Sequence, residues 1–169
     1  MTEQQSIFQV GDQVIHWSHG LGEIIQLDEK SLSGRTRQYY VVQMSELTLW
    51  VPIDQTGDRN LRLPTPKKDF KSLFQILASS GKPLSPDRNE SRLQVVERLK
   101  DHELASICRV IRDLTPHKRL KKMNENDNST LERNRNFLIN EWSVALSIPI
   151  QQAKHKLGKL LEGEENISK

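Results

Sequence analysis

The chain has a single cysteine and no long apolar run. One thiol cannot form an internal disulfide or a cysteine cluster for a metal, which excludes a disulfide-stapled fold and favours a reducing compartment. No run approaches the roughly 20 apolar residues of a membrane-spanning helix, and residues 1–10 lack the basic start and apolar stretch of a signal peptide. We therefore expect a soluble cytoplasmic protein with no membrane partner.

Signatures of catalysis are also missing. The chain has no G-x-S-x-G nucleophile motif, and its one suggestive glycine pair, in His19-Gly20-Leu21-Gly22, precedes a strand-like run rather than the helix of a phosphate loop. Glycine adopts a positive φ without steric cost, so we interpret this stretch as a hairpin turn. His16 and His19 have no cysteine or carboxylate partner at ligand spacing. We predict no catalytic residue, no metal site and no cofactor, and therefore a protein that is not an enzyme.

What is present divides the chain into two halves. Up to about Leu63, short runs rich in β-branched and aromatic residues alternate with turn residues, as in VIHW, LGEIIQL, QYYVVQM and LTLWVPI. LPTPKK, residues 63–68, is typical of a short stiff linker, and the periodicity beyond it becomes helical. We expect an α+β protein with two domains: residues 1–66 form a small antiparallel barrel, and residues 67–169 form about five helices.

Apolar stripes place the helices of the second half. Asp69 is expected to cap the first helix, whose stripe is Phe70, Leu73, Phe74 and Leu77. SRLQVVERL follows as a second helix, and ELASICRVIRDL as a third that ends before Pro116. The third helix carries an apolar stripe of Leu104, Ile107, Cys108, Ile111 and Leu114, in which the cysteine is most simply a small buried residue.

Two further helices complete this half. Asn124 is expected to cap the fourth helix, with Asp127 in its first turn. The last helix, IQQAKHKLGKLLEG, is expected to point Ile150, Ala153, Leu157, Leu160 and Leu161 inward. Two of the three tryptophans, Trp17 and Trp142, are interpreted as core residues.

The net charge of +3 is small, but the cations are clustered at residues 35–37, 67–71 and 117–122. Such clusters fit phosphate backbones or acidic protein surfaces. They fit equally well a solvated surface that is balanced by the acidic LEGEEN segment near the end of the chain.

The order and spacing of several short motifs carry a family resemblance. They are F-x-V-G-D-x-V at residues 8–14, H-G at 19–20, Y-Y-V-V at 39–42 and V-P at 51–52, then ERL…VIRDL and L-x-x-x-R-x-x-L-x-x-E at 131–141. In these the chain resembles the CarD/CdnL family of bacterial transcription regulators that bind RNA polymerase. Its first half also resembles the polymerase-interacting domain of the transcription-repair coupling factor.

The resemblance implies a fold, a partner and a docking surface. It implies that a Tudor- or SH3-like barrel docks on the protrusion lobe of the RNA polymerase β subunit, partly by edge-strand pairing, and that the protein is a monomer. The polymerase-facing positions fall on Lys30, Leu32, Gly34 and Trp50. Two of them depart from the family pattern, because lysine replaces a common arginine and Trp50 replaces a common basic residue. Alternation leaves open whether Trp50 faces outward or packs inward.

The same resemblance implies that the helical half reaches promoter DNA at the upstream fork and stabilises the open complex. The tryptophan that many members place there falls on Arg88, and no aromatic lies between Phe74 and Phe137. The DNA-facing candidates are therefore Arg88, Arg92, Lys118 and Arg119. An alternative is a polymerase-docking adaptor whose helical half binds another protein instead of DNA.

Overall fold

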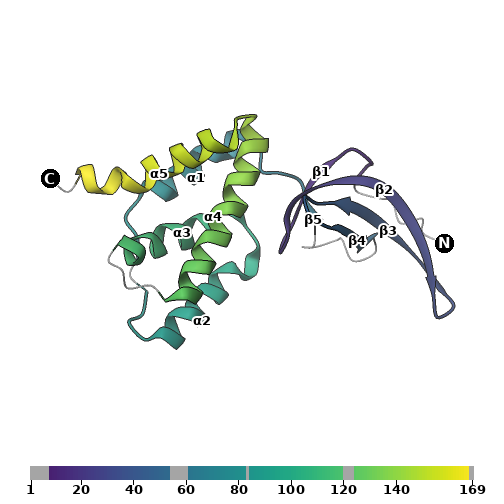
Figure 1. The fold of residues 1–169 in the computed structure, drawn as a ribbon, viewed down its shortest axis with the longest axis horizontal. Helices are drawn as coiled ribbons and strands as arrows, with labels where there is room; N and C mark the ends of the chain where they lie inside the picture. The colour runs from purple at the N-terminus through teal and green to yellow at the C-terminus, as the bar shows by residue number, and fades with distance from the viewer. Residues whose placement is uncertain (1–7, 54–60, 83, 120–123, 168–169) are drawn as a thin grey trace. The chain divides into compact units, whose positions relative to one another are not determined.

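The computed structural model describes residues 8–53, 61–82, 84–119 and 124–167, with the side chains of 117–119 and 163–167 also left out of the description. The chain forms two compact units, residues 1–64 and 65–169. The first unit contains strands and the second contains helices (Figure 1). This confirms the α+β class expected from the sequence.

The first unit is a five-stranded antiparallel sheet with the order β4-β3-β2-β1-β5. Its strands are β1 (Gln13–His16), β2 (Gly20–Leu32), β3 (Arg35–Gln43), β4 (Thr48–Pro52) and β5 (Leu61–Arg62). The first four match the expected apolar runs. Their core face buries one cluster: Phe8, Val14, Ile24, Tyr40, Val42, Met44, Val51, Ile53 and Leu61.

The sheet is open and is not the closed barrel expected from the sequence. Among the described residues, β4 pairs only with β3 and β5 pairs only with β1, so these strands form the two edges. Closure needs a ladder between the edge strands, and β5 contributes only the two residues Leu61 and Arg62, both already paired with β1.

The helical unit contains α1 (Phe70–Ala78), α2 (Arg88–Arg98), α3 (Leu104–Arg119), α4 (Glu125–Leu146) and α5 (Ile150–Ile167). Short 3-10 turns, η2 (Lys67–Asp69) and η3 (Leu99–Asp101), precede α1 and follow α2. Helices α1, α3, α4 and α5 enclose one core (Figure 1). The predicted stripes of α1 and α3 are buried or half-buried, and Trp142 lies at the centre against Phe70 and Phe74.

A buried carboxylate fixes the start of the helical unit. Glu141 of α4 is 1% exposed, and its Oε2 accepts hydrogen bonds from the Thr65 backbone N–H at 2.9 Å and from the Thr65 hydroxyl at 2.6 Å. Thr65 is the first residue of this unit, directly after Pro64. The end of the linker is therefore attached to the fourth helix.

Three local expectations for the helices are wrong. Asp69 makes no side-chain capping bond, because its backbone is already helical as the end of η2. Pro116 lies inside α3, because the helix continues past it to Arg119 although proline has no N–H to donate to the carbonyl four residues earlier. Ile150 is 45% exposed because it is the first residue of α5, before the stripe turns inward at Ala153.

The two residues predicted to cap helices, one that does so and one that does not, give a matched test. Asn124→Ala is expected to lower the free energy of unfolding by about 1 kcal/mol, because the Asn124 side chain accepts a 2.8 Å bond from the Asp127 N–H. Asp69→Ala is expected to cost less than about 0.5 kcal/mol. Urea unfolding of the full chain, followed by circular dichroism, measures both values, and equal losses would contradict this assignment of the caps.

The stability of the fold is expected to depend on pH through its single thiol, Cys108. Burial raises the pKa of Cys108 from 9.0 to about 12, with a further increase from the charge of Glu141 and a smaller opposing effect from Arg109. The unfolded chain releases this proton near pH 9 while the folded chain retains it, so the stabilising contribution is present below pH 9 and is lost as the pH approaches 12. We expect the stability difference between the native chain and Cys108→Ala to shrink over this range, measured by thermal unfolding. A constant difference would contradict the raised pKa.

Candidate functional site

The sheet face opposite the core brings together Lys30, Leu32 and Trp50. Trp50 of β4 lies opposite Val41 of β3, which lies opposite Gln26 of β2. Side chains alternate along a strand, so Lys30 and Leu32 share the face of Gln26 and Trp50. We call this surface, carrying residues 26, 28, 30, 32, 35, 37, 39, 41 and 50, the outer face.

A β-bulge decides which side chains reach the outer face. The register of β2 against β3 shifts between Ile24 and Gln26. Ile24 points into the core, and strict alternation from it would turn Lys30 and Leu32 toward the core face. The extra residue, Ile25, reverses this parity and turns them outward.

Trp50 faces outward and is 43% exposed, which settles the orientation left open by the sequence. Its indole Nε1–H donates to Asp28 Oδ2 at 3.1 Å. The Lys30 Nζ lies 4.3 Å from the centroid of the Trp50 ring, a cation–π contact worth about 0.5–1 kcal/mol at an exposed site. The contacts with Asp28 and Lys30 hold a large aromatic surface in one orientation while leaving it accessible.

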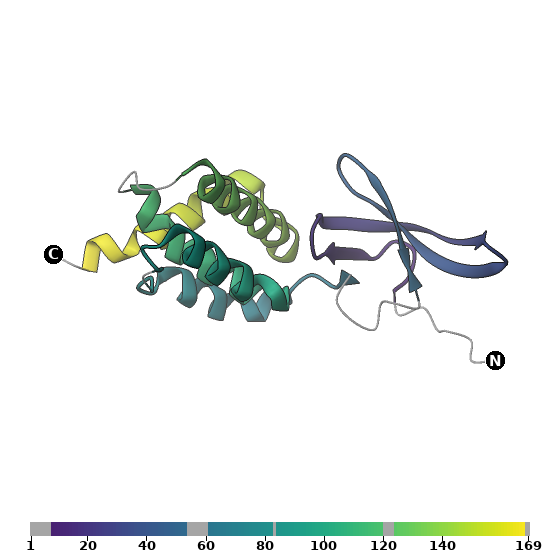
Figure 2. The ribbon, with the colours of Figure 1, turned by 90° about the horizontal axis from the view of Figure 1, so that it is seen from below.

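Leu32 and Gly34 lie at the tip of a long hairpin that β2 and β3 form beyond the end of β4 (Figure 2). Ser33 and Gly34 have φ values of 53° and 77°, as a two-residue primed turn requires. Leu32 is 66% exposed beside this turn. The Ser31 and Thr36 hydroxyls are 3.0 Å apart across the hairpin and help to hold its register.

Three residues of the outer face were missed as site candidates. Arg35, Arg37 and Tyr39 of β3 lie opposite Leu32, Lys30 and Asp28 of β2. Arg35 and Arg37 belong to a cation cluster that the sequence shows, but only the pairing register places them beside Leu32 and Lys30, two of the positions expected to face the polymerase. The outer face is thus basic and aromatic, and it adjoins an edge strand, β4, that pairs on one side only among the described strands.

The DNA-facing candidates lie in the helical unit. Arg88 is the first residue of α2 and Arg92 lies one turn later on the same side, and both are exposed. Asp87 caps this helix by accepting a 2.9 Å bond from the Glu90 N–H. Lys118 and Arg119 are in the last turn of α3, where the side chains lie outside the described residues.

Helix α2 also exposes apolar side chains. Leu93 and Val96, three residues apart, are 67% and 53% exposed. Val95 is the one buried residue of this helix. Its exposed side therefore combines basic and aliphatic groups.

The histidine-bearing turn is structural. His16 Nδ1 accepts hydrogen bonds from the backbone N–H groups of Ser18 at 3.2 Å and His19 at 3.3 Å, closing the turn between β1 and β2. Gly20 has a φ of 80° there, the positive value expected of a glycine in a hairpin turn. Trp17 is 48% exposed beside this turn, so its assignment to the core is wrong.

Within the described ranges, no group of three or more histidine, cysteine or acidic side chains is placed to hold a metal ion. Over the same ranges, no helix combines the length and apolar character needed to cross a membrane.

Comparison with known proteins agrees with this two-unit architecture. Residues 8–63 match the model of the CarD-like/TRCF RID domain, and residues 72–158 match that of the CarD C-terminal domain. The chain is also 28% identical over 151 residues, 88% of its length and 98% of the relative's, to the "Putative transcription factor YdeB" of Bacillus subtilis (strain 168). The protein therefore belongs to the CarD-like family of transcription regulators.

Proposed function

We propose that this regulator binds the β subunit of bacterial RNA polymerase through the outer face and the edge strand β4. The observation that carries the proposal is that Lys30 and Leu32 of β2 share one exposed face with Trp50 of β4, although β3 lies between the two strands. An edge strand offers main-chain hydrogen bonds to a strand of a partner, and the neighbouring side chains supply specificity. Tryptophan and arginine, both present on the outer face, are among the residue types enriched at interface hot spots.

The cations on the outer face indicate the chemistry of the partner surface. Lys30, Arg35 and Arg37 lie on the same face as Trp50, and one acidic residue, Asp28, is bonded to the indole. A lobe surface with acidic groups around an apolar pocket complements this arrangement.

We further propose that α2 contacts DNA at the upstream fork of the promoter bubble and so stabilises the open complex without enzymatic chemistry. Arg88 and Arg92 are exposed on one side of α2, where arginine can stack on a base or bind a phosphate. Leu93 and Val96 lie beside them, and aliphatic side chains can also enter an opened base step. The mixed basic and apolar surface supports this role although the family's tryptophan is absent from the start of α2.

The docking proposal predicts the effect of a double substitution. Lys30→Glu combined with Trp50→Ala is expected to weaken binding to a purified β-lobe fragment at least about thirtyfold, as loss of an interface hot spot does. Binding of the full-length chain is measured by biolayer interferometry, and thermal unfolding verifies that the variant is folded. Lys154→Glu, an identical charge change at an exposed position of α5, is the control and should bind like the native chain. Equal binding by the double variant would contradict the docking surface.

The DNA proposal predicts a smaller and salt-dependent effect. Arg88→Ala is expected to shorten the lifetime of the polymerase–promoter complex and to lower the salt dependence of protein–DNA binding by about one phosphate contact. Footprinting should show protection upstream of the bubble that requires polymerase, and Arg133→Ala on α4 is the control. If lobe binding persists while upstream protection is absent, the helical unit binds a protein partner instead, and the adaptor alternative replaces the DNA proposal.

A further inference from the structure

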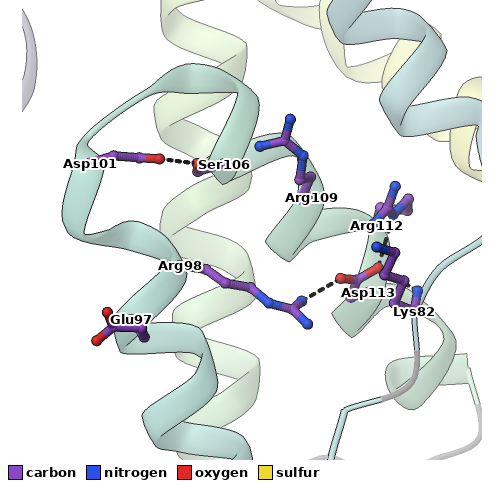
Figure 3. A pocket seen from close by; sticks show the side chains of 8 residues that line it. All are labelled: Lys82, Glu97, Arg98, Asp101, Ser106, Arg109, Arg112 and Asp113. Carbon is purple, nitrogen blue, oxygen red and sulfur yellow. Dashed lines mark hydrogen bonds and ion pairs between the residues drawn. The ribbon is translucent and has the colours of Figure 1, made fainter.

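The helical unit contains a polar pocket of about 390 Å³ between α2 and α3 (Figure 3). This volume lies in the range of sites for small ligands. Four cationic side chains line it: Lys82 from the segment before α2, Arg98 from the end of α2, and Arg109 and Arg112 from α3. The pocket is separate from the outer face of the sheet and from the exposed start of α2.

A buried carboxylate orients two of these cations. Asp113, with 1% of its side chain exposed, accepts bonds from the Arg98 guanidinium through Oδ2 and from Arg112 Nε at 2.9 Å through Oδ1. The Lys82 backbone N–H donates to the same Oδ1 at 2.8 Å. A guanidinium has five N–H donors; Asp113 uses one from each arginine, and Arg112 Nη1 also donates to the Ser79 hydroxyl at 3.0 Å. The remaining donors are held in place in advance, which lowers the entropic cost of binding a ligand.

The other acidic groups of the pocket already have partners. Glu97 Oε2 lies 2.6 Å from Lys100 Nζ. Asp101 accepts a 2.6 Å bond from the Ser106 hydroxyl and a 2.9 Å bond from the Glu103 N–H, which fixes it at the start of α3. Glu97 is therefore balanced by a lysine that does not line the pocket, whereas Asp101 and Asp113 keep their charges against the four cations, so the pocket retains an excess of positive charge.

Arg109 is the cation least used by the fold. It is exposed, and within the described part of the chain it makes no hydrogen bond or ion pair. It lies three residues before Arg112 on α3, and both side chains line the pocket (Figure 3). An anion in the pocket would therefore meet one guanidinium that no hydrogen bond of the fold occupies, in addition to the pair oriented by Asp113.

We propose that this pocket binds the phosphate groups of a free phosphorylated small molecule, with a diphosphate as the minimal ligand. Guanidinium forks that converge from α2 and α3 fit a tetrahedral, multiply charged oxyanion. Arg98 and Arg112 are only 31% and 12% exposed at their side chains, so their free donors face a hollow that a small ligand can enter. The backbone phosphates of DNA, which the same chemistry would attract, would instead meet exposed surface cations first.

The test titrates inorganic pyrophosphate into the full-length protein alone, by calorimetry at constant ionic strength, so its outcome is independent of polymerase or promoter binding. We expect saturable one-site binding and a melting temperature that rises with pyrophosphate concentration. Arg109→Ala should weaken binding at least about tenfold, because a hydrogen bond to a charged group is lost. Arg133→Ala removes the same charge at an exposed site of α4 outside the pocket and should bind like the native chain.

Three results would overturn the proposal. Absence of saturable binding at millimolar pyrophosphate would show that the pocket is not a phosphate-binding site. Equal weakening by Arg109→Ala and Arg133→Ala would show only a general attraction between cations and the anion. If fork DNA displaces pyrophosphate and Arg109→Ala weakens both ligands equally, the pocket is a backbone-phosphate contact rather than a site for a free ligand. Arg98 and Arg112 are not suitable probes, because removing either one deprives the buried Asp113 of a donor.

Discussion

The position of α2 depends on one buried carboxylate. This helix buries a single side chain, Val95, so apolar packing contributes little to holding it against the helical core. Polar contacts of Asp113 attach α2 instead. Asp113 joins Arg98 at the end of α2 to Arg112 on α3 and to the backbone at Lys82. Removing one partner of such a group leaves an uncompensated buried charge, typically at a cost of about 3–5 kcal/mol. The exposed arginines at the start of α2 are therefore oriented by a contact at its other end.

The outer face of the sheet depends on a different constraint, the position of one bulge. Because Ile25 is the extra residue in β2, Lys30 and Leu32 share a face with Trp50 rather than with the core residue Ile24. β3 lies between β2 and β4 in the sheet, so the outward-facing residues of β3, Arg35 and Arg37, belong to the same surface. A one-residue change in the length of β2 before the hairpin would exchange these side chains for Glu29 and Ser31.

Periodicity predicted most of the fold, since four strands and five helices lie where the apolar patterns placed them. It failed where the outcome depends on tertiary contacts. The pattern in VIHW does not distinguish a buried Trp17 from an exposed one, since the turn that exposes it is closed by a hydrogen bond to His16. Asp69 has the residue type of a cap, but the turn before it already has helical geometry.

The candidate site was predictable only in part, for similar reasons. Lys30, Leu32, Gly34 and Trp50 came from a family resemblance, whereas the proximity of Arg37 to Lys30 required the strand register. The pocket around Asp113 had no sequence signal, because its cations come from three segments that become neighbours only when α2 packs on α3.

The hydrogen bonds between Thr65 and Glu141 have a consequence for the linker. β5 ends at Arg62, which is paired with β1, and Thr65 is held by α4, so only Leu63 and Pro64 lie between two anchored points. From Arg62 to Thr65 there are three Cα–Cα steps, which span at most about 11 Å, and the φ of Pro64 is fixed by its ring. When one unit is bound to a large assembly, a second contact made by the other unit adds to the binding only where its site lies within the reach of this short tether. Two contacts that are each weak, one from each unit, would then act together as a single strong one.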